Sequence, residues 1–139
     1  MRKNLFKLDP RIAQVTSFIK DLPFSRLLLM NDSNYPWLIL VPRVTDKKEI
    51  FELSIKERVV LENEINVVSK LAHKLFKADK INIGALGNIV SQLHIHVIVR
   101  YENDPSWPKA AWGSGKEIPY TKKNLNSLIS KIKLALKSL

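Results

Sequence analysis

Two short apolar runs separated by a turn-rich segment set the main constraint on the fold. Residues 26–30 read RLLLM and residues 37–41 read WLILV, and the intervening NDSNYP is dense in residues that favour turns. Such a pair is typical of neighbouring antiparallel strands. Two further strands are predicted at residues 81–86 and 93–100. Strands that come in pairs, without a regular alternation of strand and helix, predict an α+β domain with a mainly antiparallel sheet.

Three helices are predicted beside this sheet. The Asp-Pro pair at residues 9–10 suits a cap and a first turn, and this helix is expected to continue to a stop at residues 21–23. The SIKE sequence at residues 54–57 matches a capping box, and the long central helix that it begins is expected to end near Phe76. A C-terminal amphipathic helix is predicted over residues 125–139.

The composition indicates one globular domain. The chain has 139 residues with no internal repeat or Gly/Ser linker, so a single domain over residues 1–139 is expected. It has no cysteine, which excludes disulfides, thiolate metal sites and a cysteine nucleophile. No stretch approaches the roughly 18 apolar residues that cross a bilayer. The N-terminal MRKNLFKLDPR lacks the long apolar centre of a secretory signal, so we expect a cytoplasmic protein without a membrane segment.

The chain is strongly basic, with 23 Lys and Arg against 13 Asp and Glu and a net charge of +10. Such a balance attracts polyanions, among them nucleic acids. The basic residues are scattered, however, and no run of four occurs. A solvated lysine-rich surface is therefore the main expectation, and nucleic-acid binding is a secondary one.

Two of the three histidines lie two residues apart in QLHIHVIVR, residues 92–100. Side chains alternate across a strand, so Gln92, His94 and His96 are predicted to share one face, with neighbouring Cα atoms roughly 6.5 Å apart. Three hypotheses account for this strip. It is a solvated sheet face, or two ligands of a metal site that a carboxylate would complete, or a nucleophilic imidazole with a helper.

The sequence QLHIHVI resembles the signature of the histidine triad superfamily, H-φ-H-φ-H-φ-φ with φ apolar, except that Gln92 stands at the first histidine. PWLILVPR at residues 36–43 is similar to a strand of that family ending in Val-Pro-Arg or Val-Pro-Lys. GALGN at residues 84–88 stands where the family has a turn before the motif, and NDPSWPKAAWG at residues 103–113 resembles a bacterial branch that also reads Q-φ-H-φ-H. The likeness covers about residues 5–115.

This resemblance implies a nucleotide hydrolase or nucleotidyl transferase that acts at an α-phosphate, typically as a homodimer. His94 matches the histidine that attacks phosphorus, with a main-chain carbonyl fixing its tautomer, and His96 matches the one that stabilises charge and assists the departing group. A dinucleoside polyphosphate is one expected substrate. Gln92 cannot titrate, so a proton relay through the first position is lost. The chemistry as the sequence presents it requires no metal or cofactor.

Further residues are assigned by the same resemblance to substrate binding. Asn88 is placed to donate to a phosphate oxygen, Asn31 or Asp32 to bind the ribose hydroxyls, and Asn82 to orient the site. For Asn31, Asp32 and Asn82, ordinary turn or strand-end hydrogen bonding is an equal alternative. Trp37 stands where some branches carry another histidine. Trp37, Trp107 and Trp112 are candidates to stack on a base or close the pocket, with core or dimer packing as the alternative.

Two other functions stay open at this level. The first is a nucleotide-binding homodimer whose turnover has weakened because Gln92 replaces a histidine. The second is a nucleic-acid binder, for which the basic charge is the argument.

Overall fold

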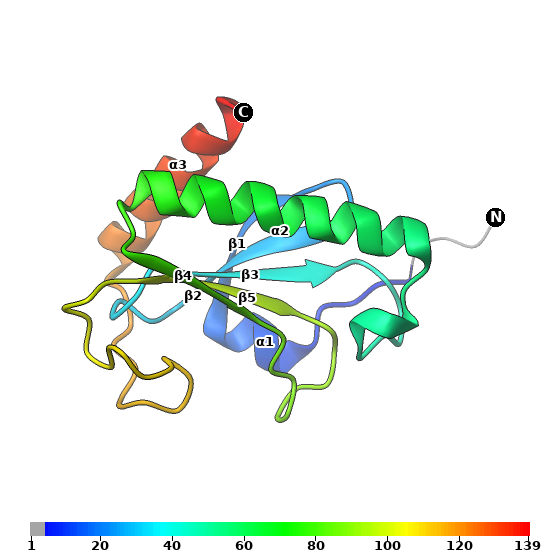
Figure 1. Cartoon of the computed structure of the whole chain (residues 1–139), viewed down its shortest axis with the longest axis horizontal. Coiled ribbons are helices and arrows are strands. Elements are labelled where there is room, and N and C mark those ends of the chain that lie inside the picture. Colours follow the sequence, from blue (N-terminus) through cyan, green and yellow to red (C-terminus); the bar gives the residue numbers. More distant parts are fainter. Residues whose placement is uncertain (1–4) are drawn as a thin grey trace.

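The computed structural model describes residues 5–139 and forms one antiparallel sheet with helices packed on it (Figure 1). The sheet has the strand order β1-β2-β3-β5-β4, and all neighbouring strands run antiparallel. This confirms the predicted α+β class. The elements in chain order are α1 (Pro10–Val15), β1 (Thr16–Asp21), β2 (Ser25–Met30), β3 (Trp37–Pro42), the 3-10 helix η1 (Ile50–Glu52), α2 (Ile55–Leu75), β4 (Lys80–Gly84), β5 (Ile95–Arg100) and α3 (Lys122–Lys137).

The prediction of one long helix near the N-terminus was wrong. Helix α1 ends at Val15, and the next six residues form β1, which pairs with β2 at the edge of the sheet. The apolar residues at helical spacing also suit a strand, and backbone pairing with β2 decided between the two. The other predicted elements are confirmed, with small shifts at their ends. The strand expected at residues 81–86 ends at Gly84, and the one expected from residue 93 begins at Ile95.

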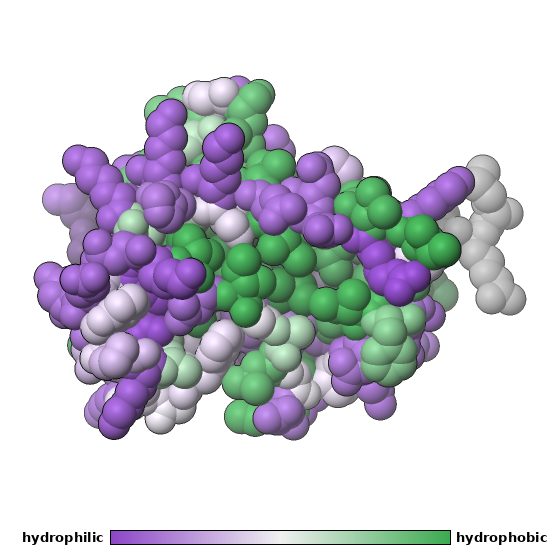
Figure 2. Space-filling model, in the orientation of Figure 1, coloured by the Kyte–Doolittle hydropathy of each residue, from purple (hydrophilic) through white to green (hydrophobic). Residues whose placement is uncertain are grey.

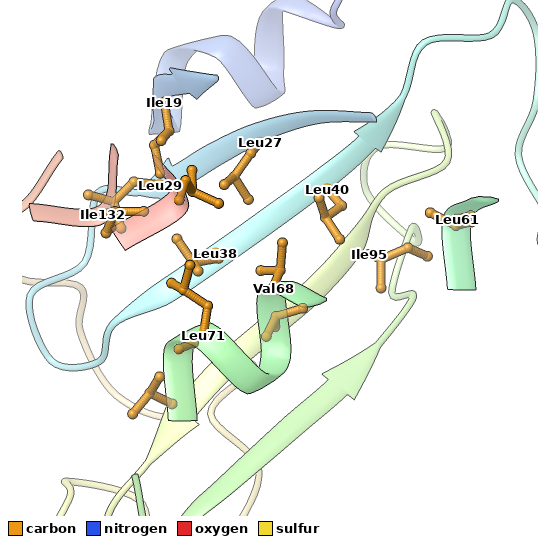
Figure 3. Close-up of a cluster of buried hydrophobic side chains, with 14 of the residues drawn as sticks. Ile19, Leu27, Leu29, Leu38, Leu40, Leu61, Val68, Leu71, Ile95 and Ile132 are labelled. Atoms are coloured by element: carbon orange, nitrogen blue, oxygen red, sulfur yellow. The ribbon is translucent and has the colours of Figure 1, made fainter. Parts of the chain in front are cut away.

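Helix α2 forms where the sequence predicted it. Ser54 accepts from the backbone N–H of Glu57, whose carboxylate accepts from the backbone N–H of Ser54, so the capping box is present. The helix lies across one face of the sheet, with α3 beside it (Figure 1). Figure 3 shows the main core between these two helices and the sheet, with Val68 and Leu71 of α2 and Ile132 of α3 facing the aliphatic side chains of the strands.

The opposite face of the sheet is covered by α1 and by the irregular segment at residues 101–121. A second apolar cluster lies there, made of Ile12, Leu28, Tyr35, Trp37, Ile39, Val41, Ile98 and Ala111. Strand β5 lies between β3 and β4, and its residues belong to the apolar clusters on both sides of the sheet, so all six of them are buried. The pair of histidines therefore does not lie on a solvated face.

A buried ion pair holds the segment that follows β5. Arg100 donates to Asp104 through Nε, and the two side chains are only 1% and 2% exposed. The same guanidinium donates to the Asn82 side chain, the Ser106 hydroxyl and the Lys109 carbonyl. The network satisfies a charge that is costly to bury, and it fixes the course of the chain toward Trp112.

Within residues 5–139, no helix has the length and apolar character needed to cross a membrane.

The Arg100–Asp104 pair predicts a large stability effect of one small change. Asp104→Asn leaves the buried guanidinium without its charge partner, and we expect the free energy of unfolding to fall by about 3 kcal/mol in urea denaturation. The control is Asp21→Asn at the partly exposed Arg26–Asp21 pair, where we expect less than about 1 kcal/mol. Equal losses in the two variants would contradict the assigned role of the Arg100 network.

Candidate functional site

The site lies where β5 begins, on the sheet face opposite α2 and α3. His96 pairs with Ile39 of β3 on one side and with Gly84 of β4 on the other. His94 directly precedes β5, and the two imidazole rings meet edge to face with centroids 4.8 Å apart. The predicted alternation is confirmed, because Leu93, Ile95, Val97 and Val99 belong to the core beneath α2 and α3, whereas both histidines face the other way.

His94 is held by the main chain of residue 92. Its Nδ1 lies 2.6 Å from the carbonyl oxygen of Gln92. A carbonyl oxygen only accepts, so Nδ1 carries the hydrogen, and Nε2 of the neutral ring keeps its lone pair. A fixed tautomer with a free nitrogen is the form that a nucleophilic histidine requires. The backbone supplies the contact, so it does not depend on which side chain stands at position 92.

His96 has the opposite tautomer. The indole Nε1 of Trp37 donates to its Nδ1 at 3.0 Å, so the hydrogen of the neutral ring lies on Nε2. Burial lowers the pKa of His96 to about 4, and the neighbouring His94 adds to this effect, whereas the main chain of Leu86 acts weakly in the other direction. His96 is therefore a neutral hydrogen-bond donor. Its Nε2 is buried and makes no hydrogen bond of ordinary geometry with any described residue.

Trp112 completes an aromatic cluster around His96. Its ring centroid lies 5.4 Å from that of His96 and 6.2 Å from that of Trp37, edge to face in both pairs. Gly84 makes room for it, since a Cβ at that position would lie 2.9 Å from the Trp112 ring. The absence of a side chain at Gly84 thus lets the indole cover the rung that carries His96.

A cavity of about 670 Å³ opens onto these rings. It is largely apolar, with charged side chains from α1 and from the segment after Trp112. Its lining comprises Arg11, Ile12, Val15, Met30, Trp37, Ile39, Leu86, Asn88, Ile89, Val90, His94, His96, Trp112, Gly113 and Glu117. A volume of this size with an apolar wall and a few convergent polar groups is typical of a small-molecule site.

A smaller and more polar cavity of about 160 Å³ adjoins the other side of His94. Its lining comprises Lys48, Glu49, Ala85, Gly87, Asn88, Ser91, Gln92, Leu93 and His94. His94 and Asn88 belong to both cavities. A molecule with an apolar part and a charged part could therefore place each part in a matching environment, with the His94 ring between them.

The side chain of Gln92 is engaged with the N-terminal segment. Its Oε1 accepts from the backbone N–H of Asp9, and its Nε2 donates to the carbonyl of Lys7, both at 2.8 Å. These bonds tie the start of α1 to the histidine strand. Arg11 follows from the same segment, where it pairs with Asp9 and donates to the carbonyl of Ile89 at 3.1 Å. The amide of Gln92 thus positions one wall of the large cavity.

The predicted substrate-binding residues are only partly brought together. Asn88 lies beside His94 in both cavities, as expected. Asn82 accepts from Arg100, Asn31 accepts from the backbone N–H of Tyr120, and neither lines either of the two cavities beside His94. Asp32 is also outside the cavity walls, and it accepts from Asn34 and from the backbone N–H of Ile118. Their direct contact with a substrate stays a prediction.

Sequence reasoning missed Arg11 and Glu117 and placed the tryptophans only in part. Trp37 and Trp112 line the cavity, whereas Trp107 lies away from it, with its ring against the Arg100 guanidinium at 5.7 Å. The Asp9-Pro10 pair predicts that a helix begins there, but it does not predict where this helix packs in the fold. No local sequence pattern therefore links Arg11 to His94. Among residues 5–139 no group of three or more His, Cys, Asp or Glu side chains is arranged to hold a metal ion.

Known proteins resemble the chain in both sequence and structure. The family model of the HIT domain matches residues 13–103. A histidine triad protein from Marinobacter aquaeolei VT8 is 42% identical over 96% of this chain and 98% of its own, with a TM-score of 0.93. A histidine triad protein from Sinorhizobium meliloti 1021 is 44% identical over 94% and 97%, with a TM-score of 0.92.

A more distant structure shares the fold alone. The diadenosine triphosphate hydrolase of Plasmodium falciparum is 18% identical over 97% of this chain and 82% of its own, with a TM-score of 0.67. No curated protein is significantly similar to the chain in sequence.

The burial of His96 predicts an unusual titration. We expect its ring to take up a proton near pH 4 in the folded protein and near 6.5 in urea, followed by NMR of the ring carbons. A folded-state pKa below the unfolded one means that stability is lost as pH falls from about 6.5 to about 4. Denaturation curves across that window test the sign. Titration of folded His96 near 6.5 would show that water reaches the ring.

Proposed function

Because the chain belongs to the HIT domain family, as its motif predicted, we propose that it is a nucleotide hydrolase or nucleotidyl transferase acting through a covalent His94 adduct. The bond cleaved is a phosphoanhydride or phosphoramidate at the α-phosphate of a nucleotide, as in a dinucleoside polyphosphate. The observation that carries the proposal is the 2.6 Å contact between His94 Nδ1 and the carbonyl of Gln92, which leaves Nε2 free to attack.

The reaction follows from the tautomer of His94, which has its hydrogen on Nδ1. The lone pair of His94 Nε2 attacks the α-phosphorus, and the bond from phosphorus to the leaving group breaks with its electron pair on that group. Positive charge then develops on the His94 ring, where the Gln92 carbonyl stabilises it through Nδ1–H. Water next attacks phosphorus, and the bond from phosphorus to Nε2 breaks with its electron pair on the nitrogen. The attacking water loses a proton to solvent, so the nucleoside monophosphate is released and His94 is neutral again.

The cavities favour a nucleotide in one orientation. The apolar wall of the large cavity suits a nucleobase, and the rings of Trp37 and Trp112 in this wall could contact the base by an edge or a face. Asn88 lies beside His94 and could donate an amide hydrogen to a phosphate oxygen. Arg11 at the large cavity and Lys48 at the small one bring positive charge near the phosphates.

A nucleotide-binding protein with weak turnover is the second candidate. The amide of Gln92 is engaged at both ends with backbone groups, so it supplies neither a proton nor a titrating relay to His94. Binding without turnover is the result that this candidate predicts.

The catalytic assignment is tested with His94→Asn. We expect the variant to lose at least about 1,000-fold in kcat on a panel of dinucleoside polyphosphates and nucleoside phosphoramidates. The matched control is His73→Asn, the same change at an exposed position of α2, which should keep full activity. Wild-type protein incubated with α-32P-labelled substrate should carry label that is stable in alkali and released in acid, as expected for a phosphorus–nitrogen bond.

The outcomes separate the candidates. Equal turnover by wild type and His94→Asn contradicts the assignment of His94. Tight nucleotide binding without turnover by wild type, measured by calorimetry, supports the binding protein instead.

We further propose that the protein is a homodimer joined through β4. This strand is one of the two edges of the sheet, and an unpaired edge is a template for pairing with another chain. Figure 2 shows a band of apolar side chains on this face, near α2 and β4. The exposed apolar residues of this region include Phe51, Ile55, Val59 and Ile83. An apolar surface beside a free strand edge is well suited to a second copy.

Light scattering after gel filtration tests the dimer. We expect a mass of about 32 kDa, twice the 16.0 kDa of the chain. Ile83→Glu, at a residue 50% exposed on β4, should give the monomer mass because it buries a charge in the interface. Leu134→Glu, at a residue 68% exposed on α3, should leave the dimer intact. A monomeric wild type at micromolar concentration would refute this assembly.

A further inference from the structure

The two ring nitrogens of His96 have very different surroundings. Nδ1 accepts from the indole N–H of Trp37 at 3.0 Å, in a buried contact. Nε2 is buried and makes no hydrogen bond of ordinary geometry with a described residue, although the ring borders the large cavity. The main chain of Leu86 raises the pKa of His96 as a hydrogen-bond partner would, but its geometry falls short of an ordinary hydrogen bond. A poorly satisfied buried donor is costly in a folded protein, and it suggests that a ligand atom completes its bonding.

We propose that Trp37 is a positioning residue that holds His96 as the neutral Nε2–H tautomer, and that the site therefore favours leaving groups that depart as stable anions. The inference rests on the proposed function and narrows its substrate class to phosphoanhydrides over phosphoramidates. Trp37 acts on the leaving group through His96, and the hydrogen bond between them is the contact that carries the argument. The Trp37 ring also lines the large cavity, and Trp37→Phe keeps an aromatic ring at that wall.

The indole excludes the other protonation states of His96. Indole is a donor only, so a hydrogen on Nδ1 would face the indole N–H with no acceptor between them. This rules out both the Nδ1–H tautomer and the doubly protonated ring while the contact lasts. Burial acts in the same direction, since it disfavours the charged form. A neutral Nε2–H donates a hydrogen bond but does not readily give up its proton.

Among residues 5–139, no other buried group near His96 replaces the missing acid. The neighbours on its rung are Ile39 and Gly84, which do not titrate. The charged or titratable side chains around the large cavity are His94, Arg11 and Glu117. His94 is the nucleophile, a guanidinium keeps its proton, and Glu117 is exposed on the segment after Trp112. Among the described residues, the buried part of the site thus offers a hydrogen bond and no mobile proton.

Whether a neutral hydrogen-bond donor suffices for bond cleavage depends on the leaving group. When a phosphoanhydride breaks, the electron pair of the phosphorus–oxygen bond stays on a phosphate oxygen, and that anion is stable with one hydrogen bond from Nε2–H. When a phosphoramidate breaks, the departing nitrogen is a strongly basic amide anion unless a proton reaches it first. A site with a neutral donor therefore serves the first reaction far better than the second.

The tautomer is tested directly on the wild-type protein, without any substrate. Two-bond 15N–1H correlation spectra distinguish a ring protonated on Nε2 from one protonated on Nδ1. We expect His96 to show the Nε2–H form only, across the neutral pH range. In Trp37→Phe, which keeps an aromatic ring but removes the N–H, we expect a mixture of tautomers and a raised pKa of His96. Trp107→Phe, the same change outside the cavity, should leave the His96 signals unchanged.

The substrate preference is tested with an adenosine phosphoanhydride and an adenosine phosphoramidate. We expect wild type to favour the anhydride in kcat/KM by at least about 100-fold, and Trp37→Phe to reduce this ratio about tenfold through kcat with little change in KM. The pH profile of the phosphoramidate reaction should also gain activity on the acid side in Trp37→Phe. Trp107→Phe should match wild type in all three measurements.

The two proposals fail in different ways. Wild type without activity on either substrate refutes the proposed function, while the spectra still decide the tautomer. An Nδ1–H signal in wild type, or unchanged His96 spectra in a folded Trp37→Phe, overturns the role of Trp37. Equal cleavage of both substrates by wild type, with the Nε2–H form present, overturns the leaving-group preference.

Discussion

The burial of β5 on both of its faces is the constraint from which the site follows. The strand lies between β3 and β4, with α2 against one face and Trp112 and the segment after β5 against the other. Polar residues on such a strand are removed from water and must find partners inside the protein. Each polar side chain of the strand accordingly has its own arrangement of donors and acceptors, and these arrangements define the chemistry.

The partners come from parts of the chain that are far apart in sequence. Trp37 on β3 meets His96, and Arg100 at the other end of β5 binds residues from β4 and from the following segment. Local partners are the Gln92 carbonyl for His94 and the Asp104 carboxylate, four residues on, for Arg100. The buried N–H groups left without partners among the described residues include His96 Nε2 and Trp112 Nε1, both in side chains that line the large cavity. Unsatisfied donors at a cavity wall favour an oxygen-rich ligand such as phosphate.

Few charged side chains lie around the two histidines. The chain has a net charge of +10, but Lys48 is the one described lysine that lines either of the two cavities. A neutral imidazole is a nucleophile, whereas an imidazolium is not, so the low pKa of His96 removes a competing positive charge from beside His94. Among the described residues, Arg11 lines the large cavity and Lys48 the small one, so each of the two cavities that share His94 has a cation in its wall. Proposed function and electrostatics are consistent in this respect.

The local sequence determined those features that depend on short-range periodicity and capping. The strands at Trp37–Pro42 and Ile95–Arg100, the capping box of α2, the opposed faces of β5 and the family motif were all readable from residue order. Tertiary structure alone decided that residues 16–21 are a strand, because pairing with β2 outweighed helical spacing. It also decided the tautomer of His96 and the place of Arg11. Hydrogen bonds between distant segments set both, and no local pattern encodes which segments meet.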